Sequence, residues 1–313
     1  MIPMRARNDG MALILAMLIA AFAATIATGL LWQQQRWASD QEHRSDQVQA
    51  QALAMAGVSW ARQILAEDRR TSTIDHLGEP WALRLPATPI EHGSVTGYIV
   101  DVQSRINVNA LKANDTRGTF TAQALTRLFA QAGLPTAAVN AIADWVDADS
   151  IVRNPGGAED PYYLSLPAPM LTANRAVMRV GELVAARGLD AGVLDRVRPF
   201  IDAVDADVKI NVNTAPAEVL LAAIPSLDRD SAALLVSERL KRPFRDVADF
   251  TSRLPQPGMV SNVELFSTDS AYFSVTVEAK QGETLARARA LVRRAATGSP
   301  QVGPPEVVWQ VVE

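Results

Sequence analysis

The apolar run over residues 11–32 constrains this chain more than any other feature. It contains no charged side chain. At about 1.5 Å per residue, a helix of that length spans a bilayer core of roughly 30 Å. Arg5 and Arg7 precede the run, and the bulk of the 313-residue chain follows it. The positive-inside rule then predicts a single-pass membrane protein with a cytoplasmic N-terminus and an exported C-terminal domain. In a bacterium, that places the anchor in the inner membrane and the domain in the periplasm.

A short polar segment that ends at Gly10 stands before the apolar run. A secretory signal has its small-residue cleavage site after the apolar segment, and no convincing A-x-A site closes this one. This order resembles the type IV pilin class of leader, residues 1–10 here. The resemblance implies that a prepilin peptidase cuts between Gly10 and Met11 and that Met11 becomes N-methylated. A plain signal anchor is the alternative.

The fifth residue after this boundary is Leu15, where pilins of this class usually carry a glutamate. A carboxylate inside a membrane is costly unless it has a partner. The resemblance implies that its partner in a fibre is the N-terminus of the subunit ahead. A leading subunit has no such partner, and an apolar residue avoids the cost. Leu15 therefore predicts a position at the tip of a fibre.

Composition excludes several classes of protein. The net charge of -4 provides no electrostatic basis for binding nucleic acid. The absence of cysteine excludes disulfides, thiol catalysis and cysteine metal sites. His43, His76 and His92 lack any ligand spacing, and the chain has no HExxH, GxSxG, Walker A or GxGxxG pattern. We therefore expect that the protein is not an enzyme.

No proline interrupts the chain between Pro3 and Pro80, which favours one long helix over residues 11–69. Its second half carries apolar residues at four-residue steps, the pattern of a helix face that is buried. We expect this stripe to pack against a sheet. Its members are Val48, Ala52, Ala56, Trp60 and Ile64, flanked by Met55 and Leu65. Residues 33–103 would then form a helical stem and the first part of an α/β domain.

Alternating β-branched and aromatic residues predict strands on both sides of the middle of the chain. The first strand covers residues 93–102. Residues 272–280 and 285–294 predict a hairpin, with Gln281-Gly282 at the turn. Residues 306–313 predict a last strand. We therefore assign residues 257–313 to C-terminal strands that complete the α/β domain.

The middle of the chain, residues 104–256, contains an internal repeat. Arg-Ile-Asn-Val-Asn at 105–109 returns as Lys-Ile-Asn-Val-Asn at 209–213, and helical segments follow each copy. We predict two helical modules, residues 104–204 and 208–256. The second resembles a helix-hairpin-helix unit, a class that often binds DNA phosphates. Its hairpin at 224–227 lacks the glycines that let backbone N–H groups approach a phosphate, so a packing or interaction role is favoured.

An acidic stretch over residues 144–163 makes the first module longer than the second. It gathers five carboxylates, two glycines and two tyrosines. Oxygen-rich segments on a backbone that can bend suit a hard cation such as Ca²⁺, although no EF-hand pattern is present. The candidate ligands are Asp147, Asp149, Glu159 and Asp160, with Asn174 and Asp144 as further candidates.

Two alternatives compete with a metal site in this stretch. One is a solvated acidic loop that has Arg153 and Arg175 as counter-ions. The other is a paired-carboxylate hydrolase, for which the sequence offers no nucleophile. Tyr162 and Tyr163 favour a loop that folds down onto the module, and a folded loop of like charges needs a counter-charge. We therefore expect calcium.

Together these features resemble the minor pseudopilin K family of bacterial type II secretion systems (general secretion pathway protein K). The resemblance covers essentially the whole chain. It rests on the Gly10/Met11 boundary, Leu15, both Ile-Asn-Val-Asn phrases and the acidic stretch with its tyrosines. It also rests on the phrase His-Leu-Gly-Glu-Pro-Trp at 76–81.

The resemblance implies an α+β fold: a pilin-like long N-terminal helix packed on a small antiparallel sheet, with a large all-α domain of two helix-hairpin-helix or SAM-like modules inserted between strands. It also implies one or two structural calcium ions in that domain. The implied partners are the minor pseudopilins of the H, I and J types, the inner-membrane assembly platform and prepilin peptidase.

The implied function is to form the tip of a periplasmic pseudopilus. There the protein would prime assembly, limit fibre length and aid export of folded proteins across the outer membrane. A minor pilin of a type IV pilus or DNA-uptake machine, and a signal-anchored periplasmic hydrolase, remain as alternatives.

Overall fold

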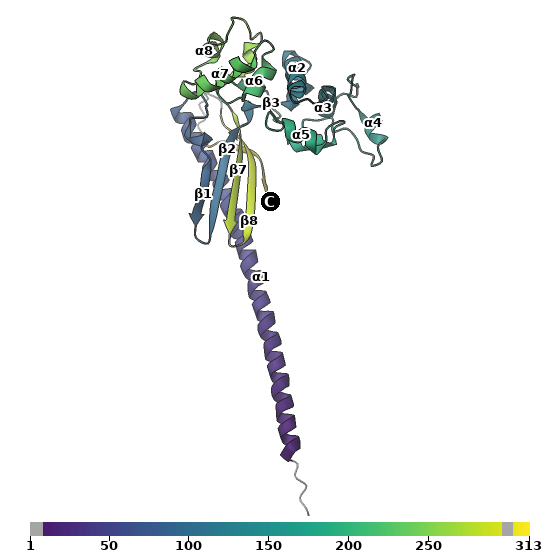
Figure 1. Ribbon diagram of the computed structural model, residues 1–313, viewed down its shortest axis with the longest axis vertical. Coiled ribbons are helices and arrows are strands. Elements are labelled where there is room, and N and C mark those ends of the chain that lie inside the picture. The colour runs from purple at the N-terminus through teal and green to yellow at the C-terminus, as the bar shows by residue number, and fades with distance from the viewer. Residues whose placement is uncertain (1–8, 296–302) are drawn as a thin grey trace, which may run out of the picture.

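The computed structural model describes residues 9–295 and 303–313, so most of the predicted leader lies outside the described residues. Helix α1 (Asp9–Thr71) has 63 residues and is about 95 Å long. Figure 1 shows it as a rod that leaves the folded part of the molecule at one end. Within the described ranges, α1 is the one helix that is long and apolar enough to cross a membrane.

The C-terminal half of α1 packs on a five-stranded sheet (Figure 1). The strand order is β1-β2-β7-β8-β9, and all neighbours are antiparallel. The strands are β1 (Leu85–Ile90), β2 (Gly93–Asp101), β7 (Tyr272–Gln281), β8 (Thr284–Arg293) and β9 (Glu306–Val312). The predicted first strand, hairpin and last strand are confirmed. Strand β1 was not predicted, because Pro86 and Pro89 interrupt its pattern.

The face of α1 that meets the sheet is not the predicted one. The buried residues are Ala50, Ala54, Val58, Ala61 and Leu65. Most of them are offset from the predicted stripe by two residues, which is about half a helical turn. From the predicted stripe, Leu65 is buried and Ile64 packs partly against this core. Ala52 and Ala56 are exposed, and Val48 and Trp60 are 67% and 54% exposed. A Cβ at Gly57 would lie only 2.6 Å from Val277 Cγ1 on β7. Close approach of the backbones therefore selected this face, rather than side-chain bulk.

The chain between β2 and β7 forms an inserted helical domain beyond the sheet, at the end of the molecule opposite the free part of α1 (Figure 1). Its α-helices are α2 (Thr116–Gln131), α3 (Ala138–Val146), α4 (Asp160–Leu164), α5 (Ala191–Val197), α6 (Ala217–Ala223), α7 (Arg229–Lys241) and α8 (Val247–Ser252). The 3₁₀ turns η2 (Val102–Ser104), η3 (Val108–Lys112), η4 (Val180–Ala185) and η5 (Val263–Leu265) complete it, and η1 (Pro80–Ala82) follows α1.

A pair of very short strands closes each module of this domain. Strands β3 (Ile106–Asn107) and β4 (Ile201–Asp202) pair in parallel, as do β5 (Ile210–Asn211) and β6 (Phe266–Ser267). Because β6 pairs with β5, residues 257–271 belong to the insertion. The predicted end of the insertion at residue 256 was therefore too early.

The two Ile-Asn-Val-Asn phrases occupy equivalent places. The Asn109 side chain donates to Val177 O and accepts from Val177 N, both at 2.9 Å. The Asn213 side chain makes the same pair of bonds with Phe244, at 2.9 and 2.8 Å. Each buried amide thus satisfies a distant backbone segment, as buried polar groups must. One hydrophobic core runs through both modules.

Candidate functional site

Two buried groups of carboxylates stand out among the described residues. In each, three side chains offer oxygen atoms that lie within 4.8 Å of one another. The first group is Asp68, Asp75 and Glu79, at the junction of the sheet and the insertion, and we call it the arginine cluster. The second is Asp147, Asp149 and Glu159, inside the insertion, and we call it the open cluster.

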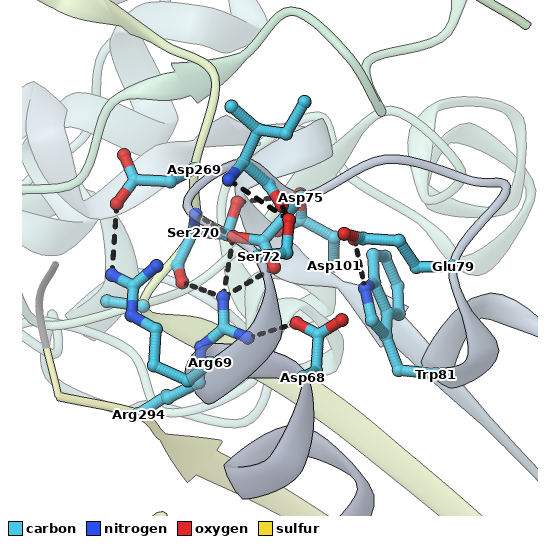
Figure 2. Close-up of polar contacts among 12 residues, drawn as sticks. Asp68, Arg69, Ser72, Asp75, Glu79, Trp81, Asp101, Asp269, Ser270 and Arg294 are labelled. Carbon is cyan, nitrogen blue, oxygen red and sulfur yellow. Dashed lines mark hydrogen bonds and ion pairs between the residues drawn. The ribbon is translucent and has the colours of Figure 1, made fainter. Parts of the chain in front are cut away.

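Arg294, directly after β8, neutralises the arginine cluster (Figure 2). Its guanidinium donates to Asp68 at 2.6 Å, to both oxygens of Asp75 and to Ser270 O at 2.9 Å. Arg294 is 3% exposed and lies over the Phe273 ring at 4.7 Å. A planar guanidinium suits such a site, because it presents several donors at fixed angles.

Glu79 and Asp75 also accept hydrogen bonds from other groups. Trp81 Nε1 and the His76 backbone N–H donate to Glu79 at 2.8 and 2.9 Å, and Ser270 N donates to Asp75 at 2.7 Å. Burial raises the pKa of Asp68 to about 6, with a further rise from the charge of Glu79. Arginine and these donors fill the space that a metal ion would need. The cluster therefore joins chain segments and is not a metal site.

Asp101 at the end of β2 extends this junction into the insertion. Its carboxylate accepts from Ser270 Oγ at 2.7 Å, from Asn211 Nδ2 at 3.0 Å and from Thr214 Oγ1. Asn211 belongs to the second Ile-Asn-Val-Asn phrase. Burial raises the pKa of Asp101 to about 6. The sheet and the second module are thus linked through one fully hydrogen-bonded carboxylate.

The open cluster is built from a helix end, a tight loop and a helix start. Asp147 is the C-cap residue of α3, and Glu159 stands immediately before α4. The loop between them turns at Gly156, where φ is +90°. A Cβ at Gly157 would overlap Asp144 Oδ2 and Arg153 O. Glycine is required at both positions for the loop to return Glu159 to Asp147.

Within the open cluster, Asp149 Oδ1 accepts from Ile151 N at 2.8 Å, but several other oxygens here have no hydrogen-bond partner among the described residues. This holds for both oxygens of Asp147 and of Glu159, for Asn174 Oδ1 and for Thr172 Oγ1. Asp147 is 3% exposed and Glu159 is 1% exposed. The Arg153 guanidinium lies 2.8 Å from Asp147 Oδ2, an ion pair without hydrogen-bond alignment. Burial raises the pKa of Glu159 to about 7, and the charges of Asp144 and Asp147 raise it further.

The predicted ligands do not all converge. Asp147, Asp149 and Glu159 do, and Asn174 adds a buried oxygen without a donor, on a backbone with φ of +45°. Asp160 is not part of this group, and its Oδ1 accepts from Thr172 N at 2.9 Å. Asp144 accepts from Arg153 N at 3.1 Å. The sequence reasoning missed Thr172, which carries no signal beyond its place near Asn174.

This donor set fits a hard cation. Carboxylate, amide and hydroxyl oxygens are what Ca²⁺ takes in proteins, and several of them are buried here without any donor. The loop is folded down as expected, since Tyr163 is fully buried against Trp145 at a ring distance of 5.1 Å. Its hydroxyl accepts from Arg187 N at 3.0 Å. A cation would supply the counter-charge that the packed loop lacks.

Comparisons with known proteins agree with this architecture. Family models described as type II secretion system (T2SS) protein K match residues 104–206 and 210–275. Protein K of Pseudomonas aeruginosa is 31% identical over 293 residues, which cover 90% of this chain and 87% of that one. The chain belongs to the type II secretion system protein K family. Protein K of Aeromonas hydrophila is 28% identical, over 90% of this chain and 91% of that one.

The fold of protein K is shared with a solved structure. A chain of the GspK-GspI-GspJ complex from enterotoxigenic Escherichia coli superposes with a TM-score of 0.74 at 24% identity. The match covers 89% of this chain and 99% of that one. The protein is a minor pseudopilin of the type II secretion system, a structural component of the machine. These matches do not favour a DNA-uptake pilin or a periplasmic hydrolase.

Proposed function

We propose that this protein K caps the tip of the pseudopilus, where it primes assembly, limits fibre length and aids export of folded proteins. The observation that carries the proposal is the place of the insertion. It lies beyond the end of α1 that is opposite the apolar segment (Figure 1), and it spans more than half of the chain. A subunit stacked above this one would have to occupy the same space.

Leu15 supports the same position by an independent argument. A subunit at the tip has no N-terminus ahead of it to neutralise a membrane-embedded carboxylate, and Leu15 avoids that cost. Changing Leu15→Glu should impair extraction from the membrane or placement at the tip, without a change in the melting temperature of the folded domain. Normal assembly by this variant would remove the electrostatic support for the proposal.

The second apolar face of α1 supports association with other minor pseudopilins of the H, I and J types. Val48, Ala52, Met55, Ala56 and Trp60 are exposed and lie outside the face of α1 that is buried on the sheet. Trp60 borders the sheet beside β2. An apolar helix face of this kind packs against another helix in water. The structurally similar chain comes from a complex of GspK with GspI and GspJ.

Co-purification tests this association. The full-length chain is co-expressed with the H, I and J pseudopilins of its own system, and a complex that contains one copy of protein K is expected. Trp60→Glu should weaken the complex, because it places a charge on the apolar face. Trp60→Phe should preserve it. Equal yields from both variants would exclude this face as the contact.

Processing and orientation complete the proposal. Prepilin peptidase cuts between Gly10 and Met11, Met11 is N-methylated, and the assembly platform receives α1 in the inner membrane with the folded domain in the periplasm. Mass spectrometry of the mature N-terminus tests this directly. A chain that retains residues 1–10 would point to a plain signal anchor.

Calcium in the open cluster is the last part of the proposal. Asp147, Asp149, Glu159 and Asn174 would hold the ion, and Thr172 is a further candidate. The ion would fix the loop between α3 and α4 on the insertion by supplying the missing counter-charge. Its role would be structural.

A further inference from the structure

The two edges of the sheet differ in their readiness to pair with another strand. Edge strand β1 contains Pro86 and Pro89, which have no N–H to donate, and its register shifts between Leu85 and Thr88. Both features block pairing. Edge strand β9 has seven residues, no proline and no lysine, and its one charged residue is Glu306 at its start. The register of β9 on β8 shifts once, between Leu291 and Val292, and the pairing from Trp309 to Val312 is regular. That part of the β9 edge has neither a proline nor a register shift to block pairing.

Some backbone N–H and C=O groups of β9 make no hydrogen bond to β8, and the strand register identifies their residues. Arg287 and Glu313 exchange two backbone hydrogen bonds, at 2.8 and 2.9 Å. Such pairs alternate with non-bonded pairs along an antiparallel ladder. The register then makes Ala288–Val312 and Ala290–Gln310 the non-bonded pairs. The N–H and C=O groups of Gln310 and Val312 therefore point away from β8, and among the described residues no strand lies on that side.

Side chains on both faces hold β9 in place. Val307 and Val312 pack against the core beneath α1, whereas Trp309 packs with Leu291 on the opposite face. Ion pairs to β8 add to this: Arg293–Glu306 at 2.6 Å and Arg289–Glu313 at 2.7 Å. A strand fixed in this way loses little conformational freedom when a partner pairs with it, which favours binding.

We propose that the free edge of β9 receives an extended, proline-free strand from a neighbouring pseudopilin anchored in the same membrane. This inference rests on the proposed function and names the contact within it. Strand addition of this kind draws its affinity from main-chain hydrogen bonds. An extended strand is the partner whose own N–H and C=O groups match those of Gln310 and Val312.

The direction of the sheet indicates a neighbouring pseudopilin rather than an exported protein. The strands run along the axis of α1, which is also the membrane anchor (Figure 1). The free edge of β9 therefore faces away from the α1 axis, in a direction parallel to the membrane plane. A neighbour with the same kind of anchor holds its own folded domain at a similar height above the membrane. Anchoring both chains raises the effective concentration of one edge near the other.

Gln310→Pro tests the proposal by removing a single backbone N–H group from the free edge of β9. Proline removes the N–H that points outward and leaves the ladder to β8 intact, because that N–H takes no part in it. Gln310→Ala is the matched control, since it keeps the N–H. In co-purification of the full-length chain with the H, I and J pseudopilins, we expect about a tenfold loss of association for Gln310→Pro and none for Gln310→Ala. Equal association by both variants would overturn the proposal.

Hydrogen exchange gives a second readout that needs no variant. The amides of Gln310 and Val312 should exchange at least about ten times more slowly in the wild-type complex than in the free chain. Unchanged exchange in an intact complex overturns strand addition and leaves the proposed function standing. A wild-type chain that associates with no pseudopilin overturns both. Protection that appears in the isolated chain with rising concentration would instead identify a second copy as the occupant.

Discussion

The arginine cluster and the open cluster each bring three carboxylates within the same distance limit, yet they are neutralised differently. In the first, Arg294 reaches Asp68 and Asp75 from the far end of the chain and is buried with them. In the second, Arg153 is 30% exposed and pairs with Asp147, while both Glu159 oxygens lack a donor. Buried like charges need a counter-charge. A fully buried arginine makes the first group a link between chain segments. In the second, a partly exposed arginine reaches Asp147 but leaves the Glu159 oxygens without a donor, which leaves the group open to a metal ion.

The largest effect should come from removing the cation of the arginine cluster. Arg294→Met leaves Asp68 and Asp75 buried without a counter-charge, which costs about 3–5 kcal/mol of unfolding free energy. Arg293→Met is the control, because Arg293 pairs with Glu306 at the surface and such pairs contribute less than about 1 kcal/mol. Urea unfolding of both variants checks the difference. Similar losses would show that Arg294 is not the counter-charge.

Added calcium should stabilise the folded protein by binding in the open cluster. At about 100 times its dissociation constant, Ca²⁺ would raise the unfolding free energy of the full-length chain by about 2.7 kcal/mol. EDTA should lower the melting temperature, and added Ca²⁺ should restore it. Glu159→Gln should abolish the response. Asp160→Asn is the matched control and should keep it, since Asp160 accepts from Thr172 N. A wild-type protein that does not respond would refute the metal site.

When calcium is absent, removing one carboxyl charge should change the unfolding free energy in opposite directions in the two clusters. Glu159→Gln removes a buried charge that has no donor and should stabilise the calcium-free protein by about 1–2 kcal/mol. Asp75→Asn removes an acceptor of Arg294 and should destabilise it by about 2–3 kcal/mol. Chemical denaturation in EDTA measures both. The same sign for the two variants would contradict the contrast between the clusters.

The smallest effect concerns pH. Burial raises the folded-state pKa of Asp101 to about 6, above its ordinary value of 3.8. Its contribution to stability is therefore fully present below about pH 3.8 and is lost as pH rises through 6. Asp101 is therefore ionised at pH 7.5 and mostly protonated at pH 5. Thr214→Val removes a donor to it. The unfolding free energy of the variant should be lower than that of the wild type by about 2 kcal/mol at pH 7.5 and by about 1 kcal/mol at pH 5. Equal losses at the two pH values would show that Asp101 does not change its protonation state between them.

Local patterns predicted much of the fold and part of the candidate site. Uninterrupted apolar and helical residues predicted α1, and alternation predicted β2, β7, β8 and β9. Asp147, Asp149 and Glu159 were recognised because the stretch that carries them is short and rich in oxygen ligands. Asp160 has the same composition around it, but its side chain turns to Thr172 N. Spacing cannot decide such a rotation, because neighbouring residues point in different directions.

The sequence by itself determined the anchor, the strands, the duplicated phrases and the place of a charged loop, because each depends on residues close together in the chain. Only the tertiary structure decided which face of α1 is buried. Two apolar faces compete on that helix, and Gly57 permits the contact with Val277 that selects one. Only the tertiary structure brought Arg294 to Asp68 and Asp75, across more than two hundred residues. The energy of a buried charge depends on what packs around it, and no local pattern records that.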